Sequence, residues 1–290
     1  MYQQSITHLN RSAVIIAIDC SVSMQSWTYL RHTRMRKMEA AALITNYTID
    51  EIVVRATRGN EIRNYYDIAV VGYSGDGVEV IIGDHSDNLV DIKSLFEVMP
   101  QPSCYQITQQ NSKGEAITTP LTLHEWVKPK ACGTTPLYEA LILIKSMLSD
   151  WCNNPHNRHS FPPLVINISD GCCSDGDYNE VVEIAKDIQV LRTTDGTTTF
   201  VNILLATDRE IREEPLMFPS LDEFTPSTDE EQLLHEMSSI LPSELDDALC
   251  KLTGYKSNKT RKCFARNASI CEILAMADIG TEGCQGIKYR

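Results

Sequence analysis

The amino-acid sequence predicts an α/β protein built on a doubly wound, mostly parallel sheet, and three observations lead to this prediction. Short apolar runs alternate with amphipathic segments along most of the chain, a pattern typical of parallel strands connected by helices. With 290 residues the chain is long enough to bury a large core. Its 42% hydrophobic and 22% charged residues are those of an ordinary globular protein.

The expected strands are the apolar runs, each bounded by polar or turn-forming residues. They cover residues 13–19, 66–73, 164–168 and 198–206. The second of these is separated from a further apolar run, residues 78–82, by only the four residues 74–77. So short a link cannot hold a parallel crossover. We therefore expect one antiparallel edge strand next to the parallel ones.

The expected helices are the amphipathic segments between these strands. They cover residues from about 34 to 57, 87–98, 137–151, 178–191 and 230–241. Residues 100–133 are rich in Gln, Asn, Thr and Pro and predict a long loop or a small hairpin insert. We expect a main domain over residues 11–245, followed by a helical extension, residues 246–290, that packs on it.

Polar oxygen groups follow directly on the first predicted strand. Asp19, Ser21 and Ser23 stand at alternate positions, so their side chains can point to one place if the chain stays roughly extended there. A carboxylate and two hydroxyls, without a softer ligand, suit a small hard cation such as Mg²⁺.

Two further loops are predicted to bring oxygen groups to the same edge of the sheet. Asp170 follows the strand over residues 164–169, and Thr134 and Thr135 lie in a turn just before the helix at residue 137. Ligands of a doubly wound sheet bind outside the carboxyl ends of its strands. Ser, Thr and Asp also favour turns and helix caps without any metal, but three such loops in order favour a cation site.

These three segments resemble the metal-ion-dependent adhesion site of von Willebrand factor type A (vWA) domains. Residues 19–23 match Asp-x-Ser-x-Ser, residues 132–141 are similar to Gly-Gly-Thr-Pro-Leu-x-x-Ala-Leu, and residues 168–171 match an aspartate-glycine loop. The resemblance covers roughly residues 11–245. It also extends to Asp175 and Asp177, which we interpret as N-caps of the helix over residues 178–191.

The resemblance implies a set of metal ligands. Ser21, Ser23 and Thr135 would bind Mg²⁺ (or Mn²⁺) through their hydroxyls, and Asp19 and Asp170 would act through ordered waters. Thr134 stands where the family usually has its second glycine, so the choice between Thr134 and Thr135 stays open. An ion held mainly by neutral oxygens keeps much of its charge and can take a carboxylate from a protein partner.

The expected function is therefore Mg²⁺-dependent protein binding, without catalysis. The sequence shows no standard signal peptide and no apolar stretch approaching 18 residues, so we expect no membrane span and a cytoplasmic location. Among vWA proteins, a chain with these features resembles the intracellular bacterial group associated with tellurium resistance. Members of that group are linked with protein kinases and phosphatases. The net charge of −13 argues against nucleic acid as a partner.

Two alternatives remain. The first is a metal-dependent phosphohydrolase with Asp19 as the nucleophile. Haloacid-dehalogenase-type phosphatases need a second carboxylate two residues later, and this chain has Ser21 there. The second is a vWA scaffold whose metal site is vestigial.

Overall fold

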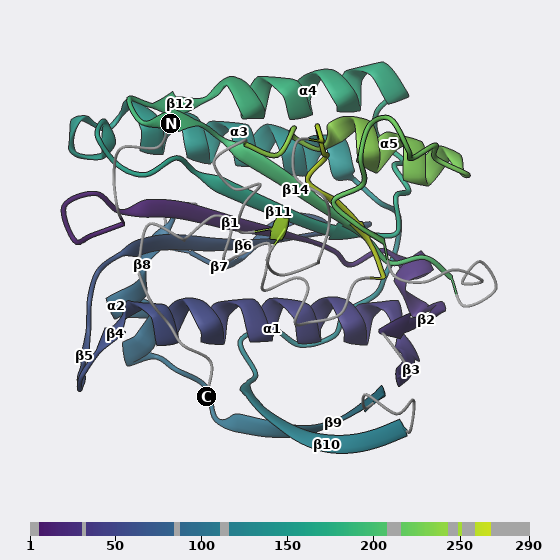
Figure 1. Ribbon diagram of the computed structural model, residues 1–290, viewed down its shortest axis with the longest axis horizontal. Helices are drawn as coiled ribbons and strands as arrows, with labels where there is room; N and C mark the ends of the chain where they lie inside the picture. Colours follow the sequence, from purple (N-terminus) through teal and green to yellow (C-terminus); the bar gives the residue numbers. More distant parts are fainter. Residues whose placement is uncertain are drawn as a thin grey trace.

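The computed structural model describes residues 6–30, 33–83, 88–110, 116–207, 216–242, 249–250 and 259–267. One eight-stranded sheet lies at its centre, with helices on both faces (Figure 1). The α/β class and the mostly parallel sheet are thus confirmed.

The central sheet has the strand order β15-β16-β14-β11-β1-β6-β7, and β8 also pairs with β6. Its strands are β1 (Ser12–Asp19), β6 (Tyr66–Ser74), β7 (Gly77–Ile82), β8 (Val90–Asp91), β11 (Leu164–Ser169), β14 (Thr199–Leu204), β15 (Leu216–Met217) and β16 (Phe264–Arg266). The five strands from β6 to β16 in this order are parallel to their neighbours. The predicted antiparallel hairpin is confirmed as β6–β7.

The helices form two layers because β1 carries apolar side chains on both of its faces. The helices are α1 (Lys37–Ala56), α2 (Ile92–Glu97), α3 (Leu137–Asn153), α4 (Tyr178–Val190) and α5 (Asp229–Met237), with short 3-10 turns η1 (Val22–Gln25) and η2 (Pro155–Asn157). Val14, Ile16 and Ile18 pack on the side of α1, whereas Ala13 and Ile15 pack with α3, α4 and α5. Figure 1 shows α3, α4 and α5 above the sheet and α1 with α2 below it.

In the described part of the chain, four hairpins lie outside the central sheet. They are β2 (Trp27–Leu30) with β3 (Thr33–Arg36), β4 (Thr57–Arg58) with β5 (Glu61–Ile62), β9 (Pro102–Gln110) with β10 (Ala116–His124), and β12 (Arg192–Thr193) with β13 (Gly196–Thr197). The β9–β10 hairpin lies on the outer side of α1 (Figure 1). Asp50 of α1 fixes the end of this hairpin, since it accepts hydrogen bonds from the backbone N–H of His124 and the indole N–H of Trp126.

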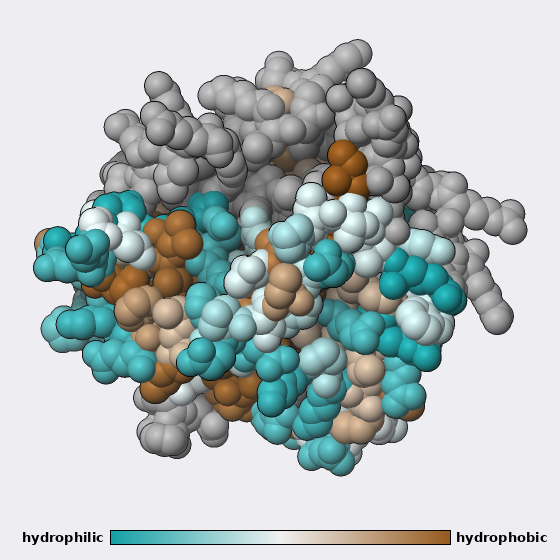
Figure 2. All heavy atoms as spheres, turned by 90° about the horizontal axis from the view of Figure 1, so that it is seen from below, coloured by the Kyte–Doolittle hydropathy of each residue, from teal (hydrophilic) through white to brown (hydrophobic). Residues whose placement is uncertain are grey.

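The insert at residues 100–133 is therefore a hairpin, one of the two forms that the sequence predicts. Seen from its side of the molecule, hydrophobic side chains lie in small groups among hydrophilic ones (Figure 2). No helix in the described part of the chain is both long enough and apolar enough to cross a membrane.

The sheet extends further along the chain than the predicted main domain. Residues 264–266, expected in a helical extension, form β16, which pairs in parallel with β14 and antiparallel with β15. The helical prediction is wrong for these residues, because Phe264 and Ala265 are fully buried beside β14, whose edge supplies their hydrogen bonds. Within the predicted extension, residues 246–248, 251–258 and 268–290 lie outside the described residues.

Candidate metal centre

The three predicted loops meet at the carboxyl ends of β1 and β11, which are parallel neighbours in register. Two backbone hydrogen bonds join the first loop to the second. The N–H of Cys132 donates to the carbonyl of Cys20 at 2.8 Å, and the N–H of Val22 donates to the carbonyl of Gly133 at 3.0 Å. Segments more than a hundred residues apart in the sequence are thus held together by their main chains.

The hydroxyls of the first loop converge, but by a different route from the expected one. Ser21 is extended, with φ −75° and ψ 165°, and the 3-10 turn η1 begins at the next residue. The condition of an extended chain is not met beyond Ser21, because the turn brings Ser23 back toward Ser21. Their hydroxyl oxygens lie 2.9 Å apart, so two oxygen groups face the same space.

Asp19, at the end of β1, is fully buried. One carboxylate oxygen accepts a hydrogen bond from the backbone N–H of Ser21 at 2.8 Å, and the other accepts one from the hydroxyl of Ser169 at 3.0 Å. The Ser169 hydroxyl in turn accepts a hydrogen bond from the N–H of Gly171 at 2.9 Å. Ser169 is not among the predicted site residues, although it lies within the segment 168–171 that resembles the aspartate-glycine loop.

Thr135 is buried, whereas its neighbour Thr134 is exposed. The backbone of Thr135 is joined to the third loop through Ser174, whose hydroxyl accepts from the N–H of Thr135 at 2.9 Å and whose N–H donates to its carbonyl at 2.9 Å. Of the two threonines only Thr135 is buried at the junction of the second and third loops, and its role as a metal ligand stays a prediction.

Asp170 is buried, and its partner is a side chain that the sequence analysis missed. The Nζ atom of Lys37 lies 3.2 Å from Oδ2 of Asp170, and these side chains are 5% and 3% exposed. The other oxygen of Asp170 faces the N–H of Cys172 at 3.4 Å. Lys37 is the first residue of α1, and a cation at a helix N-terminus opposes the helix dipole. The sequence predicts this helix from about residue 34, where Arg34 and Arg36 are also basic, so it does not single out Lys37.

The two other aspartates of the third loop are helix caps. Asp177 caps α4, as predicted, and accepts a hydrogen bond from the N–H of Glu180. Asp175 instead accepts from the N–H groups of Tyr138 and Glu139 at 3.0 and 2.8 Å. Our interpretation of Asp175 as a cap of α4 is wrong, because the loop folds back over the start of α3 and stabilises that helix.

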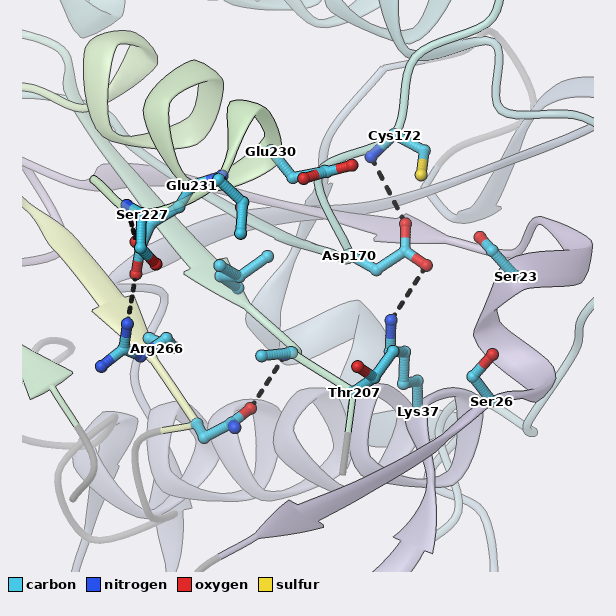
Figure 3. A pocket seen from close by; sticks show the side chains of 14 residues that line it. Ser23, Ser26, Lys37, Asp170, Cys172, Thr207, Ser227, Glu230, Glu231 and Arg266 are labelled. Atoms are coloured by element: carbon cyan, nitrogen blue, oxygen red, sulfur yellow. Dashed lines mark hydrogen bonds and ion pairs between the residues drawn. The ribbon is translucent and has the colours of Figure 1, made fainter. Parts of the chain in front are cut away.

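A cavity of about 210 Å³ opens beside Ser23 and Asp170, whereas Asp19, Ser21 and Thr135 are not among the residues that line it. Figure 3 shows Lys37 reaching toward Asp170, with Ser23 and Ser26 on one side and Glu230, at the start of α5, on the other. Within the described residues, no three or more His, Cys, Asp or Glu side chains are grouped to hold a metal ion. A cation here would therefore depend on the hydroxyl oxygens.

The donor groups present fit Mg²⁺ or Mn²⁺. The paired hydroxyls of Ser21 and Ser23 are hard oxygen ligands, and the buried carboxylates of Asp19 and Asp170 supply compensating negative charge. Burial, followed by repulsion from Asp170, raises the pKa of Asp19 to about 6. A carboxylate destabilised in this way gains from any cation that comes near it.

The raised pKa predicts an unusual pH dependence for the metal-free protein. Because the pKa of Asp19 is higher in the folded chain than its ordinary value of 3.8, protonation stabilises the fold, and this stability is lost as pH rises through about 6. The free energy of unfolding should increase by about 1 kcal/mol between pH 7 and pH 5 through this group alone.

Urea unfolding of the chelated protein at both pH values measures this contribution. Asp19→Asn is the control, since it removes the titrating group and should remove this increase. An identical pH dependence in Asp19→Asn and in the parent protein would contradict the prediction.

Comparison with solved structures shows a likeness, and comparison with family models and curated sequences shows none. No protein-family model matches the chain, and no curated protein matches its sequence. Among the solved structures that it resembles is one described as von Willebrand factor type A from Catenulispora acidiphila, with 17% sequence identity and a TM-score of 0.39 over 69% of this chain. The match covers 34% of that chain, so the present protein spans about a third of its length.

Proposed function

We propose that this chain is a vWA-type module that binds a protein partner through Mg²⁺ or Mn²⁺. Ser21, Ser23 and Thr135 would hold the ion through their hydroxyls, and Asp19 and Asp170 would act through ordered waters. The observation that carries the proposal is the 2.9 Å approach of the Ser21 and Ser23 hydroxyls in a loop whose backbone N–H, at Ser21, is bonded to the buried Asp19.

The chemistry of this donor set favours binding of a partner. A divalent ion held mainly by neutral oxygens retains positive charge and can accept a carboxylate from another protein. Asp19 cannot turn to become a strong direct ligand without losing the hydrogen bonds from Ser21 and Ser169 that hold both of its oxygens. The protein therefore keeps its negative charge behind the hydroxyls and leaves the outer side for a partner.

The same residues argue against catalysis. A phosphohydrolase with Asp19 as its nucleophile needs an acid or base close by, and Ser21 occupies the position where that carboxylate would stand. Asp19 is also fully buried beneath its hydrogen-bond donors. We therefore propose an adaptor without enzymatic activity, whose partners in a cytoplasmic bacterial stress or signalling system would include protein kinases and phosphatases.

Thermal unfolding with and without metal tests the metal dependence. At about 100 times the Kd, Mg²⁺ should raise the Tm of the chelated protein by about 5 °C or more. Asp19→Asn should abolish the increase. Asp187→Asn is the matched control, because Asp187 is a surface carboxylate on α4 paired with Lys145, and its removal should leave the increase unchanged.

An unchanged Tm in the parent protein at millimolar Mg²⁺ and Mn²⁺ would contradict the proposal. Turnover of a generic phosphate ester that disappears in Asp19→Asn would support the phosphohydrolase instead.

A further inference from the structure

We propose that the ammonium of Lys37 compensates the charge of Asp170 when no metal is bound. A divalent ion must then displace this ammonium from Asp170 in order to bind. This inference rests on the proposed function and adds to it a competitor for the metal within the chain itself. Lys37 would then set the metal concentration at which the module becomes competent to bind its partner.

The first argument is the geometry of the pair. Nζ of Lys37 lies 3.2 Å from Oδ2 of Asp170, and both side chains are almost completely shielded from solvent. A buried carboxylate needs a compensating charge, and Asp170 already receives one from Lys37. A divalent ion serving the same carboxylate would be brought close to the ammonium, where the two positive charges repel each other strongly because water is largely excluded.

The second argument is the local charge balance. Asp19 and Asp170 contribute two negative charges at the carboxyl ends of neighbouring strands, and Lys37 contributes one positive charge. The metal-free site thus has a net charge of −1 from these three groups. It becomes +1 if a divalent ion enters while Lys37 stays in place, and it is neutral if Lys37 leaves. Charge balance favours exchange of one cation for the other.

The third argument is that the main chain of Lys37 is fixed while its side chain has somewhere to go. Its backbone N–H donates to the carbonyl of Ser26 at 2.9 Å, which anchors the start of α1. The cavity of about 210 Å³ is lined by Lys37, Asp170 and Glu230, among others. The ammonium could therefore leave Asp170 by rotation of the side chain alone, toward a cavity wall that already carries a second carboxylate (Figure 3).

Isothermal titration of Mg²⁺ into the parent protein, Lys37→Met and Lys145→Met tests the exchange. Lys145 forms a surface ion pair with Asp187 at 2.7 Å and provides a matched removal of a lysine from a Lys–Asp pair. We expect the Kd for Mg²⁺ to fall by about tenfold or more in Lys37→Met, corresponding to roughly 1.4 kcal/mol, and to stay unchanged in Lys145→Met.

The outcomes separate this inference from the proposed function. Equal Kd values in the parent and Lys37→Met would overturn the inference and leave the proposed function standing. Binding by Lys37→Met alone would support the inference and contradict the proposed function of the native chain. No binding by either protein would overturn both.

A second measurement on the parent protein decides the matter even if Lys37→Met does not fold. Reductive methylation followed by mass spectrometry compares the labelling of Lys37 in chelator and in Mg²⁺, with Lys145 as the internal reference. Displacement from Asp170 predicts that Mg²⁺ increases the labelling of Lys37 several-fold relative to Lys145. A Tm increase with Mg²⁺ but unchanged labelling of Lys37 would overturn the inference, and so would the lack of both responses.

Discussion

Replacing Lys37 with methionine should lower the free energy of unfolding of the metal-free protein by about 3–5 kcal/mol at pH 7. The substitution keeps most of the aliphatic side chain but leaves the carboxylate of Asp170 buried without its cation. Asp19, which interacts electrostatically with Asp170, makes an uncompensated charge there still less favourable. Urea unfolding in the presence of a chelator measures the effect.

Three further variants, Lys145→Met, Asp170→Asn and the double variant Lys37→Met/Asp170→Asn, separate the ion pair from a general loss of packing. Lys145→Met breaks a surface pair with Asp187 and should change stability by about 1 kcal/mol or less. Adding Asp170→Asn to Lys37→Met should recover a large part of the loss, because it removes the unpaired charge. Strictly additive effects of the two substitutions would show that the 3.2 Å contact does not stabilise the protein.

Substituting Gly133 with alanine should cost about 2–5 kcal/mol and also weaken the response to metal. Gly133 has φ +62°, in the left-handed region, and a Cβ atom there would lie 2.4 Å from the Cα of Gly75. That close approach joins the turn between β6 and β7 to the loop that carries Thr135. The turn must shift to admit a methyl group, and the loop shifts with it.

Gly59→Ala is the matched control for this experiment. Gly59 has nearly the same φ, +63°, but nothing lies within 4 Å of the position of its Cβ. It isolates the backbone strain of the left-handed conformation, about 1–2 kcal/mol, from the effect of the close contact. Equal losses of stability in Gly59→Ala and Gly133→Ala would mean that the contact with Gly75 does not constrain the site.

The core of the fold was predictable because its strands have strong local signals. The runs that became β1, β6 and β11 are apolar on consecutive residues, as expected for strands buried on both faces. Helices such as α3 and α4 followed from apolar residues at helical spacing. The hairpin β6–β7 followed from the shortness of its turn.

The elements that were missed depend on contacts distant in the sequence. Strand β16 has only three residues and is a strand because the edge of β14 lies beside it; three residues are too few to show a periodic pattern. Strand β3 falls where the sequence predicts the beginning of a helix at about residue 34, whereas α1 begins about one turn later, at Lys37.

The oxygen-bearing residues of the candidate site were predictable from the sequence, but the lysine that compensates their negative charge was not. The Asp-x-Ser-x-Ser segment, the threonine turn and Asp170 could be identified because each follows or precedes a recognisable element. The pairing of Lys37 with Asp170 joins residues 133 positions apart, and no local pattern connects them. The 3-10 turn that brings Ser23 to Ser21 is likewise joined to a distant residue, through the hydrogen bond that the N–H of Val22 donates to the carbonyl of Gly133.

The most direct test of a metal centre at these loops is a Mn²⁺ titration. It compares the parent protein with a Ser21→Ala/Ser23→Ala double variant, and the paramagnetic resonance signal of Mn²⁺ measures how much of the ion stays free. The two hydroxyls, 2.9 Å apart, are the neutral ligands on which the proposal depends, and their removal leaves Asp19, Asp170 and Lys37 in place. We predict that the parent chain binds one Mn²⁺ and that the double variant binds none over the same range. Equal binding by both proteins, or no binding by the parent at millimolar Mn²⁺, would contradict the proposed metal centre.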